Sequence, residues 1–450
     1  MKKQVLMCAP FNTRSGYGDH ARSIFYSIMD RENLEIKCVD VRWGSTPRNH
    51  LDPNNPKHKK LLDTFIDGKN IQQPDIYIDI RIPNEFQTPA KVNIGITAGV
   101  EADICSAEFV MGCNKMNLNI VTSNFTRETF MRSVYDKVND QTKQAEGEVR
   151  ISKPMEVLSE GIDTNIYKPI SDAGRSDDPF KKQIYDLIKE NFVYLFVGQW
   201  GKGGYGEDRK NISVMIKTFI QTFANQKNPP ALLLKTNGAD FSILDRKEIV
   251  DKIREIKDQF KELDSVPNIY LLHGDLTLEQ MAILYNLPKI KAMLSCTHGE
   301  GFGRPLAEAT CCDLPVIASS WSGQMDFLHP KQSTLIEGEL KPIPKALIWK
   351  PIIVEPGKWF NVSEIDVVRK LRFFHKNHKK LKHQAKILGM NNRSKFSLTT
   401  MAKTFNKIID NVLTAIPETP KPVSLKLPKL KKKTGSKPAT IKLPKLKKVT

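Results

Sequence analysis

Two glutamates with seven residues between them flank a glycine-rich turn in the second half of this chain. Glycines stand at positions 299, 301 and 303, Glu300 lies between the first two, and Glu308 follows the turn. Glycines at such a turn let the backbone approach a ligand closely. Taken alone, an ordinary strand–loop–helix unit with its glutamates in solvent explains the segment equally well.

The strand and helix expected on either side of this turn would make it a favourable binding site for an anion. An apolar run at 291–296 has the length of a strand. A helix is expected over 305–312, because Pro305 suits the first helical position. The N-terminus of a helix offers free N–H groups and the positive end of a dipole, and both favour a phosphate group.

A second glycine-rich loop lies earlier in the same half. It spans 198–206, follows a strand pattern at 192–197, and leads through Arg209 and Lys210 into a helix pattern. Lys210 could be an ordinary surface lysine of that helix. Because it follows a glycine loop directly, we favour a contact with phosphate instead.

The N-terminal half repeats the alternation of strand and helix. A buried strand is expected at 4–9, then a loop with Gly16 and Gly18, then a helix. Further strand patterns follow at 35–39, 76–80, 92–96 and 118–121. The order predicts a doubly wound parallel sheet. A third glycine of the dinucleotide fingerprint is absent after Gly18, so no nicotinamide site is predicted.

Polar loops follow two of these strands. Glu101 stands in the loop after 92–96, and Ser123 follows 118–121, where it would cap a helix. Ligands of open α/β sheets bind outside the carboxyl ends of the strands. Glu101 is therefore a candidate catalytic residue, although a solvated loop carboxylate is the alternative. For Ser123 we favour the cap alone.

Composition describes a globular chain with an unusual tail. The 450 residues are too many for one core and indicate two domains. No apolar run approaches the roughly 20 residues that span a bilayer. The seven cysteines form no metal spacing and suit free thiols, which indicates the cytoplasm.

Positive charge is concentrated at the C-terminus. The net charge is +19, and residues 421–450 hold eleven lysines and no acid, which leaves +8 for the rest. The motif at 425–432 recurs at 441–448 with prolines, which is typical of a disordered tail. A polyanionic partner is expected there, either DNA or an anionic membrane surface. A basic helix is also expected over 363–388, for which a solvated face is the commoner explanation.

These patterns divide the chain into five parts. We expect an N-terminal Rossmann-like domain over 1–170, a linker over 171–190, a C-terminal Rossmann-like domain over 191–360, helices over 361–415 that pack back toward the first domain, and a disordered basic tail over 416–450.

Over roughly residues 1–415 the sequence resembles a GT-B glycosyltransferase, and more narrowly the retaining family 4 (glycosyl transferases group 1). The strongest element is the segment from Glu300 to Glu308, which is similar to the family's E-x7-E region. Supporting segments are 15–18, 160–164, 196–198, 209–211, 271–276 and 314–318.

The resemblance implies a nucleoside-diphosphate sugar as the donor substrate, no cofactor and no metal ion. Lys210 would bind the diphosphate, Glu300 the donor sugar and Glu308 the ribose, and Glu101 is expected near the reacting centre. The implied catalytic residues are Glu101, Lys210 and Glu300. The implied donor-binding residues are Gly16, Gly18, Gln199, Arg209, Lys210, His273, Gly274, Glu300, Gly301, Phe302, Gly303 and Glu308.

One residue departs from the family pattern. Members often carry an arginine as a second phosphate ligand where this chain has Gln199, which is neutral. Arg209 or Lys202 could supply the missing charge. No Asp-x-Asp motif stands beside the donor loops, and the cations can provide the charge stabilisation that Mg²⁺ gives elsewhere.

Several alternatives stay open at this point. The reaction could be epimerisation of a nucleoside-diphosphate sugar on the same fold. The chain could instead be a non-catalytic protein that binds nucleic acid or a membrane surface with a decayed enzyme fold. For a transferase, the acceptor could be DNA with a modified base, a glycan or a lipid. The sequence does not address the oligomeric state.

Overall fold

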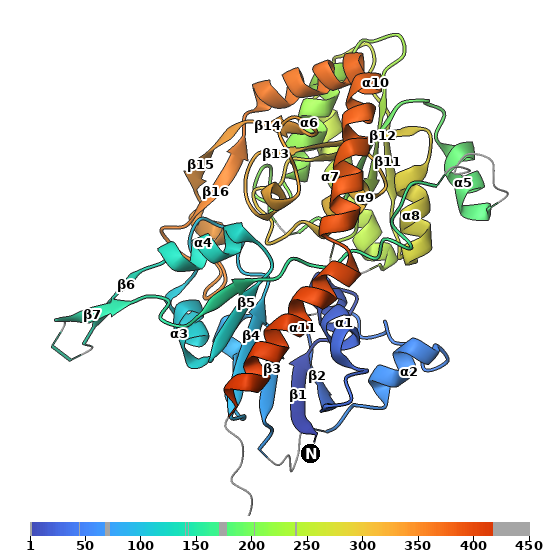
Figure 1. The fold of residues 1–450 in the computed structure, drawn as a ribbon. Helices are drawn as coiled ribbons and strands as arrows, with labels where there is room; N and C mark the ends of the chain where they lie inside the picture. Colours follow the sequence, from blue (N-terminus) through green and yellow to red (C-terminus); the bar gives the residue numbers. More distant parts are fainter. Residues whose placement is uncertain are drawn as a thin grey trace, which may run out of the picture.

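The computed structural model describes residues 2–44, 46–67, 73–139, 141–142, 144–170, 178–201, 203–238 and 241–416. Two six-stranded parallel sheets form the centres of two domains (Figure 1). The basic tail at 421–450 and Lys202 lie outside the described residues. In the part that is described, no helix is long and apolar enough to cross a membrane.

The N-terminal domain is built on a sheet with the strand order β2-β1-β3-β4-β5-β8. Its strands are β1 (Lys3–Ala9), β2 (Leu34–Asp40), β3 (Ile76–Ile80), β4 (Val92–Thr97), β5 (Leu118–Val121) and β8 (Met155–Val157). Its helices are α1 (Gly16–Ile28), α2 (Pro56–Leu62), α3 (Ala107–Lys115) and α4 (Asn124–Arg132). Strand β3 is buried at every residue, as expected for a parallel strand covered by helices on both faces.

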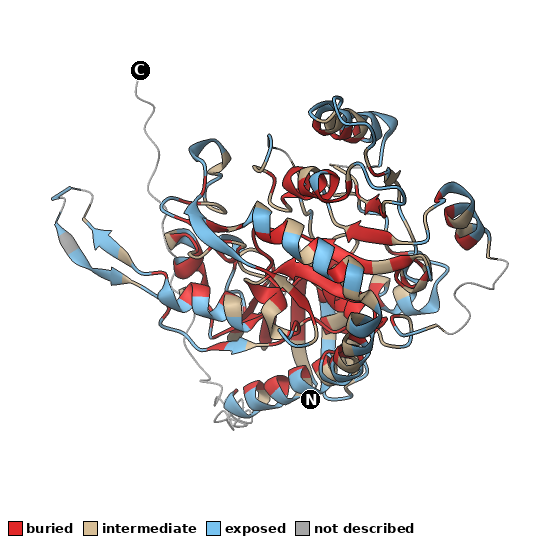
Figure 2. Ribbon diagram, turned by 90° about the horizontal axis from the view of Figure 1, so that it is seen from above, coloured by how far each residue is buried: buried red, intermediate tan, exposed pale blue. Residues whose placement is uncertain are grey.

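The C-terminal domain repeats the plan with the strand order β11-β10-β9-β12-β13-β14. Its strands are β9 (Val193–Val197), β10 (Ala231–Lys235), β11 (Ile269–Leu272), β12 (Ile290–Ser295), β13 (Val316–Ser319) and β14 (Thr334–Ile336). Its helices are α6 (Ile212–Phe223), α7 (Ile243–Asp258), α8 (Leu278–Asn286) and α9 (Arg304–Cys311). Figure 2 shows buried strands between helices that are exposed on their outer sides.

Two small antiparallel pairs complete the strands. They are formed by β6 (Tyr135–Val138) with β7 (Ala145–Val149), and by β15 (Gly338–Pro342) with β16 (Lys358–Val362). Helix α5 (Pro179–Leu187) lies within the segment expected to be a linker. Short 3-10 turns lie at η1 (Pro83–Glu85), η2 (Gly323–Asp326) and η3 (Lys345–Leu347).

The strand orders fix where a ligand would bind. In each sheet the winding reverses between two neighbouring strands, β1 and β3 in the first and β9 and β12 in the second. Ligands of doubly wound sheets bind at such reversals, outside the carboxyl ends of the strands. The glycine-rich loops predicted from the sequence follow β9 and β12, so both lie at the reversal of the second sheet.

The last two helices connect the domains. Helix α10 (Glu364–Lys395) packs on α6 and α9 of the C-terminal domain. Helix α11 (Leu398–Ala415) then crosses to the N-terminal domain (Figure 1), where the fully buried Phe405 joins its core. At the crossing point, the Leu398 N–H donates to the Ile162 carbonyl at 2.9 Å, so two segments that pass between the domains lie side by side.

Element boundaries differ slightly from the expectation. Strand β12 begins and ends one residue before the predicted 291–296, and α9 begins at Arg304 rather than at Pro305. Gly303 caps α9 in the left-handed region (φ 93°), so Arg304 is already helical. Helix α10 extends to Lys395, beyond the predicted end at 388, and continues through Gly389, which is buried where a Cβ would lie 2.5 Å from the Thr310 carbonyl oxygen.

Candidate active site

A cavity of about 510 Å³ lies between the two domains. It is bounded by the loops after β1 and β4 on one side and by the loops after β9, β10 and β12 on the other. We call it the interdomain cleft. Its lining includes Gly16, Tyr17, His20, Glu101 and Glu160 from the N-terminal domain, and Gln199, Arg209, Lys210, Glu300, Gly301, Phe302, Gly303 and Arg304 from the C-terminal domain.

Glu300 holds two cations at the centre of this cleft. Its carboxylate accepts a hydrogen bond of 2.5 Å from the Lys210 amine, and a second of 3.3 Å from the Arg209 guanidinium. Burial disfavours the charged carboxylate, but the two cations outweigh it and hold the pKa of Glu300 below its ordinary value. Burial lowers the pKa of the Lys210 amine, against the opposing effect of Glu300.

The loop before α6 fixes these two cations in place. The buried carboxylate of Asp208 accepts from the N–H of Ile212 at 3.1 Å and so caps the helix. Asn211 takes the left-handed conformation (φ 54°) that turns the chain into α6. Between these two residues, Arg209 and Lys210 face the cleft.

Arg209 also spans the two domains. Its guanidinium lies 3.4 Å from the carboxylate of Glu101 in the N-terminal domain. It donates to the Gly299 carbonyl at 2.9 Å in the C-terminal domain. Arg209 therefore links Glu101 to the turn that carries Glu300, so these three predicted charged residues lie close together.

Two glycines of the turn are required mainly because the two domains approach each other closely there, and less because a ligand must approach the backbone. A Cβ added at Gly299 would lie 2.5 Å from the Glu101 carbonyl oxygen, and one at Gly301 would lie 2.4 Å from that of Ala98. Both positions exclude a side chain because the backbone of the other domain is too close. Only Gly303, with its positive φ, is required by the turn itself.

Gln199 lines the cleft, and its amide is directed to the backbone. The Nε2 group donates to the Gly238 carbonyl at 2.6 Å. Arg209 lines the same cleft and lies next to Lys210. Phe302 also lines the cleft, and its ring packs in the core against Phe327 at a centroid distance of 5.2 Å.

Glu308 does not line the cleft, although the arginine that it holds does. It accepts from Arg304 Nε at 3.1 Å and from the Tyr285 hydroxyl at 3.3 Å. The same arginine lies 3.5 Å from the carboxylate of Glu160. Burial raises the pKa of both Glu160 and Glu308 to about 7, against the opposing charge of Arg304.

Three other predicted residues also lie outside the cleft lining. Gly18 is buried within α1, where a Cβ would lie 2.5 Å from the Thr13 carbonyl oxygen. His273 is paired through Nε2 with Asp245 at 2.8 Å, and Gly274 follows it with a φ of 129°. The side chain of His273 is therefore engaged within its own domain, and Asp275 beside it forms an ion pair with Arg14 of the N-terminal domain.

The structure adds residues that sequence reasoning missed. His20 lies in the cleft and is 3% exposed, and neither of its ring nitrogens has a hydrogen-bond partner among the described residues. Burial, with a smaller contribution from Arg304, lowers the pKa of His20 to about 3, so the ring is neutral. Its spacing from Tyr17, one turn earlier on α1, was the signal available in the sequence.

Tyr17, which lines the cleft, connects α1 to the end of β4 in the N-terminal domain. Its hydroxyl lies 2.9 Å from the Thr97 hydroxyl and accepts from the Ala98 N–H at 3.1 Å. Glu160 and Arg304 were also not predicted as site residues. Their contact with each other joins segments that are distant in sequence. Among the described residues, no group of three or more His, Cys, Asp or Glu side chains is placed to hold a metal ion.

Comparison with known proteins gives matches at the level of structure. No protein-family model matches the chain, and no curated protein matches its sequence. A sucrose-phosphate synthase from Thermosynechococcus elongatus matches with a TM-score of 0.61 at 12% identity, over 92% of this chain and 100% of that chain. The HepE protein of Anabaena, solved in complex with UDP and glucose, matches with a TM-score of 0.60 at 12% identity, over 91% and 100%.

A third structure agrees with these two. An alpha,alpha-trehalose 6-phosphate synthase from Burkholderia multivorans matches with a TM-score of 0.58 at 10% identity, over 93% of this chain and 100% of that chain. All three matches cover more than nine-tenths of this chain. The predicted fold class is thereby confirmed: the chain has the GT-B fold, with two Rossmann-like domains that face each other across a cleft.

Proposed function

We propose that the protein is a glycosyltransferase that moves a sugar from a nucleoside-diphosphate sugar to an acceptor. The observation that carries the proposal is the meeting of Arg209, Lys210 and Glu300 in the interdomain cleft, at the strand reversal of the second sheet. The HepE protein, which has the same fold, was solved with UDP and glucose. A related ligand in this cleft would meet cations for its diphosphate and a carboxylate for its sugar.

The cations supply the chemistry that the leaving group needs. When the bond between the sugar and the diphosphate breaks, its electron pair passes to the phosphate oxygen, so negative charge accumulates there. Lys210, Arg209 and the N–H groups around Gly301 and Gly303 then interact more strongly in the transition state than in the ground state. Glu300 orients both cations and would exchange part of this pairing for hydroxyl groups of the donor sugar.

The roles of the remaining predicted residues follow the same logic. Glu308 holds Arg304 at the edge of the cleft, and contact of Glu308 with the ribose of the donor remains a prediction. Backbone near His273 and Gly274 would hold the nucleobase, since their domain carries the donor loops. The loop with Gly16 would lie over the sugar and phosphate from the opposite domain.

We further propose that transfer proceeds with retention of configuration and without a metal ion, as in family 4. In this scheme the acceptor oxygen attacks the anomeric carbon on the face that the diphosphate leaves. Its proton passes to the departing phosphate oxygen, so no enzyme nucleophile is required. Glu101, held by Arg209 at 3.4 Å, would lie beside the reacting centre and position the acceptor. Closure of the two domains would exclude water from the cleft.

The acceptor is proposed from charge. The lysines at 421–450 would hold a polyanionic acceptor, either DNA with a modified base or a lipid-linked glycan at a membrane surface. Prolines at 428 and 444 disfavour a continuous amphipathic helix, which makes DNA the better candidate. Transfer to DNA would require the target base to leave the stack.

A donor assay tests the function directly. The protein is incubated with a panel of nucleoside-diphosphate sugars and with DNA, lipid and protein acceptors, and sugar transfer is followed by mass spectrometry. We expect release of nucleoside diphosphate with one donor, and a loss of about 100-fold or more in Lys210→Ala and Glu300→Gln. Lys217→Ala is the matched control, because Lys217 pairs with Glu364 outside the cleft.

Other outcomes would point elsewhere. Conversion of the donor sugar without any transfer would favour epimerisation, and unchanged biological activity in Glu300→Gln would exclude an enzymatic role. The anomeric configuration of the product, determined by NMR, tests retention. Activity that survives chelation of divalent metals tests metal independence.

A further inference from the structure

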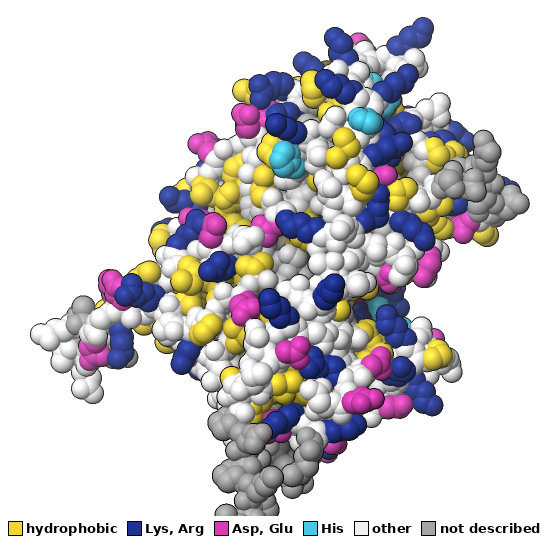
Figure 3. All heavy atoms as spheres, viewed as in Figure 1, with side chains coloured by type: hydrophobic (Ala, Val, Ile, Leu, Met, Phe, Trp, Pro, Cys, Tyr) yellow, Lys and Arg dark blue, Asp and Glu magenta, His cyan; other side chains and the backbone are white. Residues whose placement is uncertain are grey.

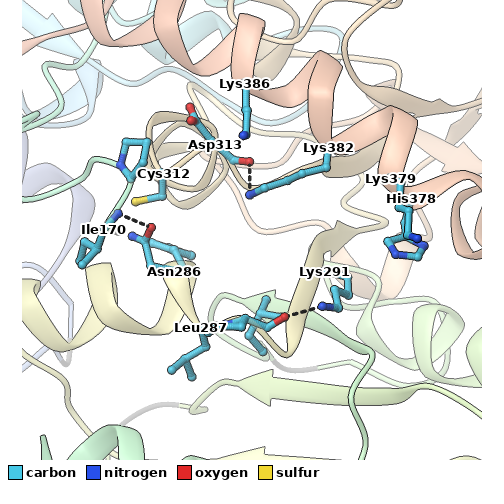
Figure 4. Close-up of a pocket in the computed structure, with 14 residues that line it drawn as sticks. Ile170, Asn286, Leu287, Lys291, Cys312, Asp313, His378, Lys379, Lys382 and Lys386 are labelled. Atoms are coloured by element: carbon cyan, nitrogen blue, oxygen red, sulfur yellow. Dashed lines mark hydrogen bonds between the residues drawn. The ribbon is translucent and has the colours of Figure 1, made fainter. Parts of the chain in front are cut away.

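A second cavity lies within the C-terminal domain and shares no lining residue with the interdomain cleft. Its volume is about 490 Å³. It is formed by the end of α8, the beginning of β12, the turn after α9 and one face of α10 (Figure 4). We call it the lysine cavity, because Lys291, Lys379, Lys382 and Lys386 line it together with His378.

The charge in the lysine cavity is almost entirely positive. Asp313 is the one carboxylate among the described residues that line it. That carboxylate is already engaged by Arg393 at 2.6 Å. Within the described part of the chain, no carboxylate oxygen lies within 4 Å of the four lysine amines. The cavity therefore holds several cations and a single carboxylate, which Arg393 already engages.

Two of the amines are fixed by backbone carbonyls. Lys382 Nζ donates to the Asp313 carbonyl at 2.8 Å, and Lys291 Nζ donates to the Pro288 carbonyl at 2.5 Å. Figure 4 shows Lys382 and Lys386 projecting from α10 toward the turn with Cys312 and Asp313. Burial lowers the pKa of Lys382 against the opposing charge of Asp313, and Lys386 and Lys291 make smaller contributions in the lowering direction. An anion bound among these amines would favour their charged forms.

The positive surface continues out of the cavity along α10. Lys379, Lys382 and Lys386 are spaced by three and four residues, so they share one face of the helix. Arg372, Lys376 and Lys380 form a neighbouring exposed row. Figure 3 shows the basic side chains gathered at the end of the molecule where α10 lies.

We infer that the lysine cavity and the adjoining face of α10 bind the phosphodiester backbone of a nucleic-acid strand. A row of basic groups along several turns of α10 matches a chain of phosphates better than a single phosphate, which carries too little charge to engage it. Phe373, 51% exposed beside this row, offers a ring on which a base can stack. The inference concerns binding only and does not depend on sugar transfer.

A membrane surface fits these residues less well. The lysine cavity is concave, and a flat bilayer follows its walls poorly at the half-buried Lys291. The exposed apolar side chains of α10 are Ile365, Phe373 and Met390, which are separated along the helix and form no continuous apolar stripe. Lipid headgroups therefore become an alternative outcome of the experiment.

Salt-dependent binding of an oligonucleotide tests the inference. The full-length protein is titrated into a fluorescein-labelled single-stranded oligodeoxynucleotide at several NaCl concentrations, and affinity is measured by fluorescence anisotropy. In a variant with Lys291, Lys379, Lys382 and Lys386 changed to Gln, we expect more than tenfold weaker binding. The slope of log K against log salt should fall by about 3, since each phosphate contact contributes about 0.7 to 0.9.

The control removes the same charge elsewhere. Lys59, Lys153, Lys227 and Lys261 are exposed and lie outside both cavities, so changing them to Gln should leave the slope nearly unchanged. The double variant Lys379→Gln, Lys386→Gln keeps the two carbonyl-bound lysines and should show about half of the effect. It covers the case in which the fourfold variant folds poorly. Equal slopes in the test and control variants would overturn the inference.

Two further probes separate the other ligands. If the fourfold variant loses binding to phosphatidylserine vesicles but keeps its affinity for the oligonucleotide, the surface binds membranes and the inference is wrong. Calorimetry with inorganic phosphate tests for a small-anion site. If wild type binds phosphate saturably, and the fourfold variant loses this binding but still binds the oligonucleotide, the cavity is a small-anion site and the inference is wrong. Turnover of a sugar donor should be unchanged, because these lysines lie outside the interdomain cleft.

Discussion

The hydroxyl of Ser123, at the start of α4 in the N-terminal domain, donates a hydrogen bond of 2.6 Å to the carbonyl of Gly301 in the C-terminal domain. Next to it, the Asn124 N–H donates to the carboxylate of Asp326 at 2.9 Å. The turn that carries Glu300 is thus fastened to the opposite domain at the point where the two backbones approach each other. Its position in the cleft depends on contacts with both domains.

Loss of the Ser123 hydroxyl should affect activity as well as stability. Ser123→Ala removes the cap of α4, which costs about 1 kcal/mol, and also the contact with Gly301. We expect a lower Tm and a several-fold lower kcat/KM for the sugar donor. Ser106→Ala is the control, because Ser106 caps α3 by accepting from the Phe109 N–H, without an interdomain contact. Equal loss of activity in both variants would contradict the role of the Gly301 contact.

The local part of the site was predictable from the sequence, and its long-range part was not. The glycine loops after β9 and β12 were recognisable because apolar runs of strand length precede them. Arg209, Lys210 and Glu300 were predicted from their positions beside these loops, and the structure brings them together. The cap by Ser123 was also predicted and is confirmed. Its hydrogen bond to Gly301 joins residues 178 positions apart, and no local pattern encodes such a contact.

Arg209 should compensate for the neutral Gln199. Arg209→Gln removes a cation from the proposed diphosphate site and leaves Glu300 with Lys210 alone, so we expect kcat/KM for the donor to fall about 100-fold. Introducing Gln199→Arg into this variant should restore part of the loss, since position 199 lines the same cleft. The measurement is the rate of nucleoside-diphosphate release at several donor concentrations.

Two results would separate compensation from simple loss of structure. The double variant should recover activity without any change in Tm relative to Arg209→Gln. If Gln199→Arg has no effect in that background, or if Arg209→Gln remains fully active, Arg209 is not the second phosphate ligand. Lys202, which lies outside the described residues, would then be the next position to change.

Glu160 and Glu308 should make stability fall as the pH rises. Both have pKa values of about 7 in the folded protein, above the ordinary value of 4.5, because burial disfavours their charged forms. The folded state therefore binds protons more tightly than the unfolded state, so stability declines between about pH 4.5 and pH 7. Glu308→Gln is neutral at all pH values and removes one of these contributions.

Thermal unfolding at a series of pH values measures this effect. The free energy of unfolding of Glu308→Gln, relative to that of wild type, should rise by about 2 kcal/mol between pH 5 and pH 8. This corresponds to a rise of a few degrees in the difference between the two Tm values. Glu255→Gln, an exposed change on α7, is the control for removing a carboxylate from the surface. A constant difference for Glu308→Gln would show that Arg304 fully compensates its charge.

The fold followed from periodicity, whereas the course of the final helices was harder to place. Alternating strands and helices predicted two parallel sheets, which the structure and its matches confirm. The helix predicted over 363–388 continues to Lys395, because Gly389 allows close packing against the Thr310 carbonyl and does not end the helix, which stops at Phe396. The basic tail stays a prediction, since it lies outside the described residues. Contacts such as Arg304 with Glu160 depend on how the domains pack, which periodicity does not specify.

His20 should be a ligand contact in the interdomain cleft rather than a structural histidine. A buried polar group without a hydrogen-bond partner costs about 1 to 3 kcal/mol, and His20 lines the cleft with both ring nitrogens in that state. We therefore expect His20→Leu to raise the Tm while lowering kcat/KM for the donor about tenfold or more. His20→Gln, which keeps a donor and an acceptor, should retain more activity.

A second unpartnered histidine provides the control for His20. His375 on α10 also has a buried ring nitrogen, Nδ1, without a partner, but it packs against Phe192 far from the cleft lining. His375→Leu should raise the Tm and leave donor turnover unchanged. Stability is read from thermal unfolding and activity from nucleoside-diphosphate release. If His20→Leu turns over the donor as fast as wild type, the ring of His20 only fills space. The two histidine variants would then behave alike, with a higher Tm and unchanged donor turnover.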